Sequence, residues 1–296
     1  MEKEMSKIAV ITDSNAHITP EEAKALGIGV VPMPFTIGEE TFYEGINLTR
    51  EDFYAKMESG ANIVTSQPSP SDVMKIWDDA LKTHDEVVYI PMSSGLSGSC
   101  QSARMLSDDY DGKVQVVNNQ RISVTQKRSV LDAIEMAQMG MSAREIREEL
   151  EFVRYESSIY IMLDTLHYLK KGGRITPAAA AVGSLLRIKP VLQIKGERLD
   201  AFSKARTLGQ GKNIMINAMK HDIDTLYGGS DKENVWLYAV HGNVPEQLAE
   251  FAQEVRAAFP GIRVQEDVLS LSIACHIGPG ALAIACSRKI PHSKDQ

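Results

Sequence analysis

The stretch Val87–Ala103, VVYIPMSSGLSGSCQSA, gives the clearest indication of the fold. Its first six residues are largely apolar and have the length of a buried strand. Ser93–Ser99 follows as a loop of serines and glycines, and a helix is expected from about 98 to 109. A strand, a polar loop and a helix in this order are the first part of a βαβ unit.

The same alternation continues on both sides of this stretch. We expect further strands at 8–12, 28–34 and 113–118, a hairpin at 35–45 that turns near Gly38, an extended loop at 62–70, and helices at 20–26, 50–58, 70–82, 123–139 and 142–154. Most of these strands are apolar throughout, as in a parallel sheet covered on both faces. The sequence therefore predicts an α/β fold whose N-terminal domain, residues 1–156, holds a largely parallel sheet flanked by helices.

The second half has a different pattern. Two short strands, 191–194 and 198–202, flank Gly196 and predict a hairpin. Other elements are expected around this hairpin: strands at 158–163, 235–240, 262–267 and 281–285, and helices at 166–171, 177–186, 207–226 and 245–259. Hairpin strands mixed with helices indicate a C-terminal α+β domain at 157–296.

Composition and charge exclude several classes of function. The chain has 43% hydrophobic and 24% charged residues, as in globular proteins, and its net charge of −7 argues against a nucleic-acid-binding surface. Three cysteines, Cys100, Cys275 and Cys286, lack CxxC spacing and predict neither a disulfide framework nor a zinc site. No metal and no cofactor are expected.

Two segments bear on the location of the protein. The start, MEKEMSKIAVITDS, has no apolar core of the kind that signal peptides carry. The longest apolar stretch, Pro177–Ile194, is interrupted by Arg187, Lys189 and Pro190. We therefore expect no integral membrane segment and a cytoplasmic location.

The serine-rich loop suits an anion. Its backbone N–H groups and the start of the following helix offer partial positive charge, and Ser97 and Ser99 can cap the helix or donate a hydroxyl to a ligand. A capped turn without a ligand has the same composition. Phosphate is one candidate anion, although neither GxxxxGK[ST] nor GxGxxG is present.

Nucleophilic attack is the rival interpretation. Gly95–Ser99, GLSGS, nearly matches the G-x-S-x-G elbow of α/β-hydrolases and departs from it only at Ser99. His241 and His276 lie downstream, where such a hydrolase carries its base. Cys100 is a weaker nucleophile candidate, because no neighbouring feature would lower its pKa.

Five segments occur in the order of one known family. They are Thr12-Asp13-Ser14, Thr65–Pro70 (TSQPSP), Ser93–Ser99 (SSGLSGS), Leu166–Ile175 (LHYLKKGGRI) and Cys275–Ala281 (CHIGPGA). The ordered set, across nearly the whole chain, resembles the DegV family of bacterial fatty-acid-binding proteins. Ser99-Cys100 stands where that family usually has a threonine and an aromatic residue, a departure expected to alter packing rather than ligand contact.

The resemblance implies a function without catalytic residues. It implies that a long-chain fatty acid binds with its carboxylate at the domain interface, held by Thr65, Ser97 and His276, while its tail enters an apolar tunnel in the second domain. It also implies that the protein presents the acid to a separate fatty-acid kinase, which makes an acyl phosphate for phospholipid synthesis. Basic residues then expected to face the kinase or the new phosphate are Arg174, Lys204 and Arg206.

Elementary chemistry is compatible with that implication. Two hydroxyls, loop N–H groups and an imidazole can satisfy a buried carboxylate, and a protonated His276 would offset its charge. Small residues followed by large aliphatic ones at Pro177–Ile194, with Ala180 among them, suit a tunnel wall, although the same pattern suits ordinary helix packing. A serine acyl-hydrolase using Ser97 and His276 remains the alternative, and a fatty-acid-responsive regulator is a third option without a DNA-binding motif to support it.

Overall fold

The chain divides into two compact units. The computed structural model describes residues 6–174, 176, 188–227 and 234–290. Unit 1 comprises Met1–Arg154 and Ile290–Gln296, and unit 2 comprises Tyr155–Lys289. The sequence placed the whole of 157–296 in the second domain, whereas Ile290 packs into a core cluster of unit 1. The expected helix at 177–186, with Ala180, lies outside the described residues.

Unit 1 is built on a four-stranded parallel sheet. The strand order is β2-β1-β6-β7, and every pair is parallel: β1 (Ile8–Asp13), β2 (Gly29–Val31), β6 (Glu86–Ile90) and β7 (Val114–Val116). The prediction of a largely parallel sheet is confirmed. The register of β1 with β6 pairs Ile8 with Glu86 and Thr12 with Ile90, so these two strands end side by side.

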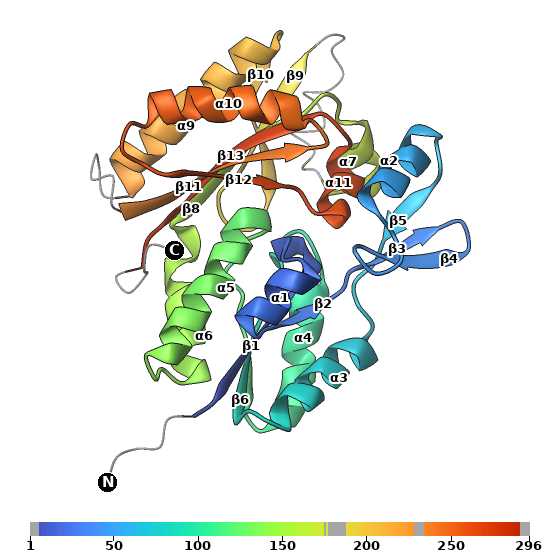
Figure 1. Cartoon of the computed structure of the whole chain (residues 1–296), viewed down its shortest axis with the longest axis vertical. Coiled ribbons are helices and arrows are strands. Elements are labelled where there is room, and N and C mark those ends of the chain that lie inside the picture. Colours follow the sequence, from blue (N-terminus) through green and yellow to red (C-terminus); the bar gives the residue numbers. More distant parts are fainter. Residues whose placement is uncertain (1–5, 175, 177–187, 228–233, 291–296) are drawn as a thin grey trace. The chain divides into compact units, whose positions relative to one another are not determined.

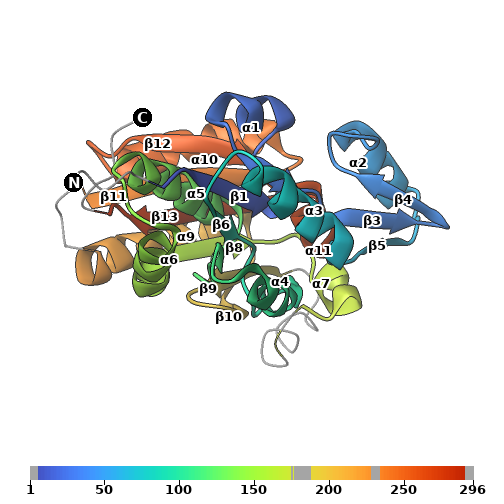
Figure 2. The same cartoon turned by 90° about the horizontal axis from the view of Figure 1, so that it is seen from below.

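Helices cover both faces of this sheet (Figures 1 and 2). On one face Val10 and Val88 pack into a cluster with α5 (Ser123–Gln138) and α6 (Ala143–Phe152). On the other face alternate residues, such as Ile11 and Tyr89, pack with α3 (Pro70–Leu81) and α4 (Ser99–Ser107). Burial on both faces explains why these strands are apolar throughout.

A small antiparallel sheet lies beside the main one in unit 1. Its order is β4-β3-β5, with β3 (Pro34–Ile37), β4 (Glu40–Tyr43) and β5 (Ile63–Thr65). The predicted hairpin turn is confirmed, since Gly38 has a φ of +66°. The segment at 62–70, expected as an extended loop, begins with a short strand, because β5 pairs with β3 and places Thr65 opposite Phe35. The ring of Phe35 packs edge-on against Phe53 of α2 (Arg50–Glu58).

Side-chain caps set the starts of the helices around these sheets. The Thr19 hydroxyl accepts from the backbone N–H of Glu22, whose carboxylate accepts from the N–H of Thr19, and α1 (Pro20–Leu26) follows. Ser69 caps α3 by accepting from the N–H of Asp72, and Pro70 occupies the first helical position.

Unit 2 contains a six-stranded mixed sheet. Its order is β10-β9-β8-β13-β11-β12, with β8 (Ser157–Met162), β9 (Lys189–Ile194), β10 (Leu199–Ala205), β11 (Val235–Gly242), β12 (Val264–Val268) and β13 (Ala281–Arg288). The last of these strands in the chain, β13, lies inside the sheet and pairs antiparallel with both β8 and β11. The expected hairpin is formed by β9 and β10.

The described residues of unit 2 also form two long helices and two short ones. Both α9 (Leu208–Leu226) and α10 (Pro245–Ala258) contribute to the main apolar cluster of this unit, and Figure 1 shows them on one face of the sheet. The short helices are α7 (His167–Gly172) and α11 (Leu271–Ile277), and they pack on one another. The sequence did not predict α11. None of the helices among the described residues combines the length and hydropathy needed to cross a bilayer.

Candidate functional site

The loop that follows β6 is a compact turn held by its own backbone. The carbonyl of Ser93 accepts from the N–H groups of Leu96 and Ser97, at 3.1 Å each. The Ser93 N–H in turn donates to the carbonyl of Arg121 at 2.9 Å. The turn is thereby tied to the segment that follows β7.

Ser97 carries a hydroxyl that suits an anionic ligand. The side chain is half-buried, and its Oγ accepts from the N–H of Ser99 at 3.2 Å. Because a hydroxyl both donates and accepts, the O–H of Ser97 can still donate to a carboxylate oxygen. Gly98 is the N-cap of α4 and supplies no side-chain cap. The Ser97 oxygen therefore stabilises the turn, and no hydrogen bond among the described residues uses its hydroxyl proton.

The loop carrying Thr65 lies against the start of α4. Gln67 donates from Nε2 to the Ser102 hydroxyl at 3.3 Å, and a Cβ at Gly98 would be 3.4 Å from its Oε1. Thr65 itself ends β5 and is half-buried. The structure thus brings together the two segments, 65–70 and 93–99, that hold Thr65 and Ser97. The sequence did not predict the bridging role of Gln67, although the residue stands inside the quoted motif.

The Thr12-Asp13-Ser14 motif fixes the ends of three strands. Thr12 donates from Oγ1 to the carbonyl of Ile90 at 2.7 Å, and the Ser14 hydroxyl accepts from the N–H of Met33 at 3.0 Å. Asp13 accepts from the N–H of Met92 at 2.7 Å. These bonds hold the carboxyl ends of β1 and β6, and the chain after β2, in one arrangement, and the serine loop begins from that arrangement.

Asp13 is the centre of a buried polar network. Its carboxylate, with no exposed surface, also accepts from the N–H and the Nδ2 of Asn15 and from Nε2 of Gln126. Burial raises the pKa of Asp13, and the hydrogen bonds from Met92, Asn15 and Gln126 oppose that rise. All four partners are donors, so the group acts as an acceptor that positions the loop.

Cys100 follows the loop, and its thiol is buried. Its side chain is packed in the apolar cluster between the sheet and α3. Burial raises the pKa of the Cys100 thiol to about 11, so the reactive thiolate is scarce at neutral pH.

The two glycine-containing motifs of unit 2 pack on each other through α7 and α11. A Cβ at Gly172 would lie 2.6 Å from Nδ1 of His276, and a Cβ at Gly278 would collide with the ring of Tyr168. Both glycines therefore allow an aromatic ring of the opposite motif to lie against the backbone. His276 stands in the last turn of α11. No element was predicted for this part of the chain, although Leu271, Ala274 and Cys275 are buried at helical spacing.

Burial governs the protonation of His276 in the ligand-free protein. Burial, with the positive charge of Arg174 as a second cause, lowers the pKa of His276 to about 4. At neutral pH the imidazole of the ligand-free protein is therefore neutral, whereas the expected protonation of His276 concerns a bound carboxylate and stays a prediction. A neutral ring offers one N–H donor and one acceptor nitrogen.

An NMR pH titration checks this protonation state. We expect the ring signals of His276 in the ligand-free protein to change with a midpoint near pH 4, far below the usual range around 6.5. On acidification, the imidazole is protonated in the unfolded chain before it is protonated in the folded protein. The contribution of His276 to the free energy of unfolding is therefore fully present above about pH 6.5 and is lost as the pH falls towards 4. A midpoint above 6 would contradict the burial of the ring.

The three basic residues expected to meet a partner are all exposed. Arg174 follows α7 and donates from Nη1 to the carbonyl of Gly172 at 2.5 Å. Lys204 lies on the edge strand β10, and Arg206 follows directly after it. Within the described parts of the chain, no group of three or more histidine, cysteine or acidic side chains is arranged to hold a metal ion.

Sequence comparison places this arrangement among known proteins. A family model described as an uncharacterised protein of the DegV family matches residues 7–289. A DegV domain-containing protein of Listeria innocua is 33% identical over 287 residues, which cover 96% of this chain and 99% of that protein. Another from Deinococcus radiodurans is 32% identical over 281 residues, or 94% of this chain and 97% of that protein.

Solved structures have the same fold. A DegV family protein from Thermus thermophilus, described by its fatty acid binding, superimposes with a TM-score of 0.87 at 29% identity and covers 96% of this chain and 100% of that chain. DegV of Bacillus subtilis, described as a fatty acid binding protein, gives a TM-score of 0.85 at 29% identity with the same coverage. The extent of these matches settles the relationship: the chain belongs to the DegV family.

Proposed function

We propose that this protein binds a long-chain fatty acid, with its carboxylate held by Thr65 and Ser97 and its tail in an apolar tunnel of unit 2. The observation that carries the proposal is the contact between the two motif loops, in which Gln67 lies against Gly98 and Ser102. The Thermus thermophilus and Bacillus subtilis relatives, each described as binding fatty acid, support the choice of ligand.

The chemistry of the loops suits a carboxylate. A carboxylate removed from water needs several donors, and bonds to an ionised oxygen are stronger than those between neutral groups. Ser97 keeps a hydroxyl proton, and the start of α4 adds backbone N–H groups beside it. We include His276 in the head-group set. As a neutral imidazole it would contribute a single N–H donor without any positive charge.

The tail supplies most of the affinity in this account. Burying fourteen methylenes contributes about 11 kcal/mol, at ~0.8 kcal/mol for each, and immobilising the ligand costs at least ~4 kcal/mol of this. The loss of one hydrogen bond to a charged group amounts to about 1.5–3 kcal/mol. Chain length should therefore matter more than any single head-group contact.

Binding measurements test whether the tail contributes more to the affinity than a single head-group contact does. We expect Thr65→Ala and Ser97→Ala each to weaken palmitate binding by roughly ten- to a hundred-fold, because each removes one donor to the carboxylate. Replacing palmitate by laurate removes four methylenes and should weaken binding of the unaltered protein by a few hundred-fold. Calorimetry or a fluorescent-fatty-acid displacement assay measures both. Thr41→Ala, an exposed threonine on β4, is the matched control.

If Thr65→Ala or Ser97→Ala weakened palmitate binding more than the change from palmitate to laurate weakens binding of the unaltered protein, the head group and not the tail would dominate the affinity. If Thr65→Ala and Ser97→Ala bound palmitate as tightly as the Thr41→Ala control, these hydroxyls would not be part of the site.

We also propose that the bound acid is presented to a separate fatty-acid kinase for acyl-phosphate formation in phospholipid synthesis. Arg174, Lys204 and Arg206 are exposed cations able to meet an acidic partner surface or the new phosphate. The variant Arg174→Gln/Arg206→Gln should keep its palmitate affinity and lose kinase-dependent phosphorylation. Unchanged phosphorylation would exclude these arginines from the docking surface.

Ester hydrolysis distinguishes the alternative, a serine acyl-hydrolase that uses Ser97 and His276, from a carrier. A hydrolase cleaves a p-nitrophenyl ester and stops when Ser97 is changed to Ala. A carrier shows no such activity and retains the acid intact.

A further inference from the structure

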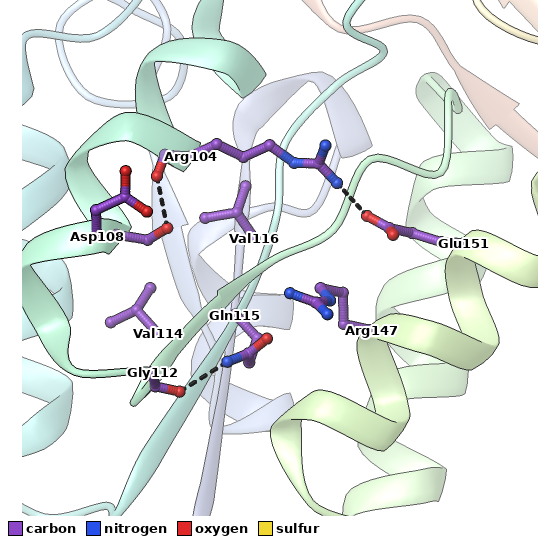
Figure 3. Close-up of a pocket in the computed structure, with 9 residues that line it drawn as sticks. Arg104, Asp108, Gly112, Val114, Gln115, Val116, Arg147 and Glu151 are labelled. Atoms are coloured by element: carbon purple, nitrogen blue, oxygen red, sulfur yellow. Dashed lines mark hydrogen bonds and ion pairs between the residues drawn. The ribbon is translucent and has the colours of Figure 1, made fainter.

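A cavity of about 500 Å³ lies in unit 1 along the free edge of β7 (Figure 3). Residues of α4, β7 and α6 line it, and the volume is within the range of ligand-binding cavities. None of the motifs discussed above contributes a lining residue.

The main chain of β7 offers unused hydrogen-bonding groups to this cavity. β7 is the last strand of the parallel sheet, and Lys113 and Val117 direct their hydrogen bonds to β6: Val87 N–H donates to the Lys113 carbonyl, and Val117 N–H donates to the Tyr89 carbonyl. In a parallel pair of strands, each residue directs its N–H and its C=O to the same side of the strand, and successive residues alternate between the two sides. Val114 and Val116 therefore present two N–H and two C=O groups at the open edge.

Two side chains lining the cavity have buried polar atoms that lack a partner among the described residues. Gln115 is only 6% exposed, and its Nε2 donates to the Gly112 carbonyl at 2.7 Å while its Oε1 is unpaired. Nε of Arg147 is likewise buried and unpaired, while its Nη2 forms a long ion pair with Glu148 at 3.7 Å. Figure 3 shows the Arg147 side chain extending from α6 towards Gln115. Unpaired buried polar atoms are costly, so a partner for them is expected.

The remaining ion pair closes one end of the cavity. Arg104 of α4 contacts Glu151 of α6 at 2.5 Å, across the chain near Val116 (Figure 3). Glu151 also accepts from the N–H of Asn118 at 2.8 Å, so both charges are already satisfied. On the α6 side of the cavity, Arg147 has a long ion pair, 3.7 Å from Nη2 to Glu148, and its guanidinium can still bind a ligand's anionic group.

We propose that this cavity binds a short extended peptide segment that pairs with the edge of β7 and places a carboxylate on Arg147. The open edge alternates donors with acceptors, Gln115 adds an acceptor, and Arg147 adds a charged donor. A simple anion satisfies only the donors in this set. A peptide main chain offers N–H and C=O groups in alternation, which is the basis of recognition by strand addition. The proposal is independent of fatty-acid binding.

The test uses the full chain and a defined probe, the capped tetrapeptide acetyl-Val-Thr-Val-Glu-amide. Its β-branched residues favour an extended chain, and its glutamate supplies the carboxylate. We expect saturating peptide to slow hydrogen exchange at the Val114 and Val116 amides at least ten-fold, followed by NMR. Arg147→Gln should weaken binding at least ten-fold. Arg144→Gln, an exposed arginine on the same helix and outside the lining, is the matched control and should leave binding unchanged.

Two further probes distinguish a peptide site from an anion site. A peptide N-methylated at the amides that face β7 should fail to bind, because it cannot donate to the strand. Sodium glutamate at the same concentration should leave the Val114 and Val116 amides unprotected. The proposal is overturned by unchanged exchange at these amides, by equal binding of the N-methylated peptide, or by equal effects of the Arg147 and Arg144 variants.

Discussion

Replacing Asp13 by asparagine should destabilise unit 1 by roughly 3 kcal/mol, although the two side chains have the same shape. The buried carboxylate accepts four hydrogen bonds, one of them on Oδ2 from Met92 and three on Oδ1 from Asn15 and Gln126. Asparagine offers one acceptor oxygen and one NH₂ group, so a donor must face either Met92 N–H or Asn15 N–H. Each unsatisfied buried donor costs about 1–3 kcal/mol, and bonds to a charged group are lost as well.

Urea unfolding followed by tryptophan fluorescence measures this loss. The chain has two tryptophans, Trp77 in unit 1 and Trp236 in unit 2, and both are buried. A Trp236→Phe background leaves Trp77 as the reporter of unit 1. The control is Asp109→Asn, an exposed aspartate, for which a change within about 0.5 kcal/mol is expected. Equal stability of the Asp13 and Asp109 variants would show that the network does not hold the strand ends.

Replacing Gly278 by alanine should destabilise unit 2 by about 3 kcal/mol or more. Gly278 has φ +75° and ψ −179°, a conformation in which residues other than glycine are strained by about 1–3 kcal/mol. The new methyl group would also collide with the ring of Tyr168, and overpacking adds about 1–3 kcal/mol. Since α11 carries His276, the same change should displace that ring.

Gly173→Ala is the control for this variant. Gly173 also has a positive φ, +66°, but a Cβ there would meet no atom within 4 Å. Gly173→Ala should therefore lower the free energy of unfolding only through the strain of a left-handed backbone, by about 1 kcal/mol. Urea unfolding in a Trp77→Phe background reports unit 2 through Trp236, and the NMR signals of His276 report the ring. If both glycine variants lose the same stability, the contact with Tyr168 contributes nothing.

Elements marked by local signals were predictable from the sequence. The apolar runs at Ile8–Thr12 and Val87–Met92 identified the parallel sheet, and Gly38 and Gly196 identified the two hairpins. The helix expected at 50–58 likewise has a local cause, because the Thr49 hydroxyl accepts from the Asp52 N–H at the start of α2. In each case the residues that produce the structure are neighbours in the chain.

Features that depend on distant residues were not predictable in the same way. β5 was missed because its pairing needs β3, which lies some 30 residues earlier in the chain. The Gln67–Ser102 contact joins residues 35 positions apart. The neutral state of His276 results from burial against α7, which its flanking glycines do not reveal. The short helix α11 was obscured by the same glycines, which belong to its end rather than to a loop.

The central claim is that Thr65, Ser97 and His276 donate hydrogen bonds to the carboxylate of a bound fatty acid. The most direct measurement is native mass spectrometry of the purified protein, followed by solvent extraction and identification of any released lipid. The account predicts one fatty acid for each chain, in its unmodified acid form, and a reduced bound fraction in the Thr65→Ala/Ser97→Ala double variant. A protein that carries no fatty acid, and takes up none when incubated with palmitate, would contradict it.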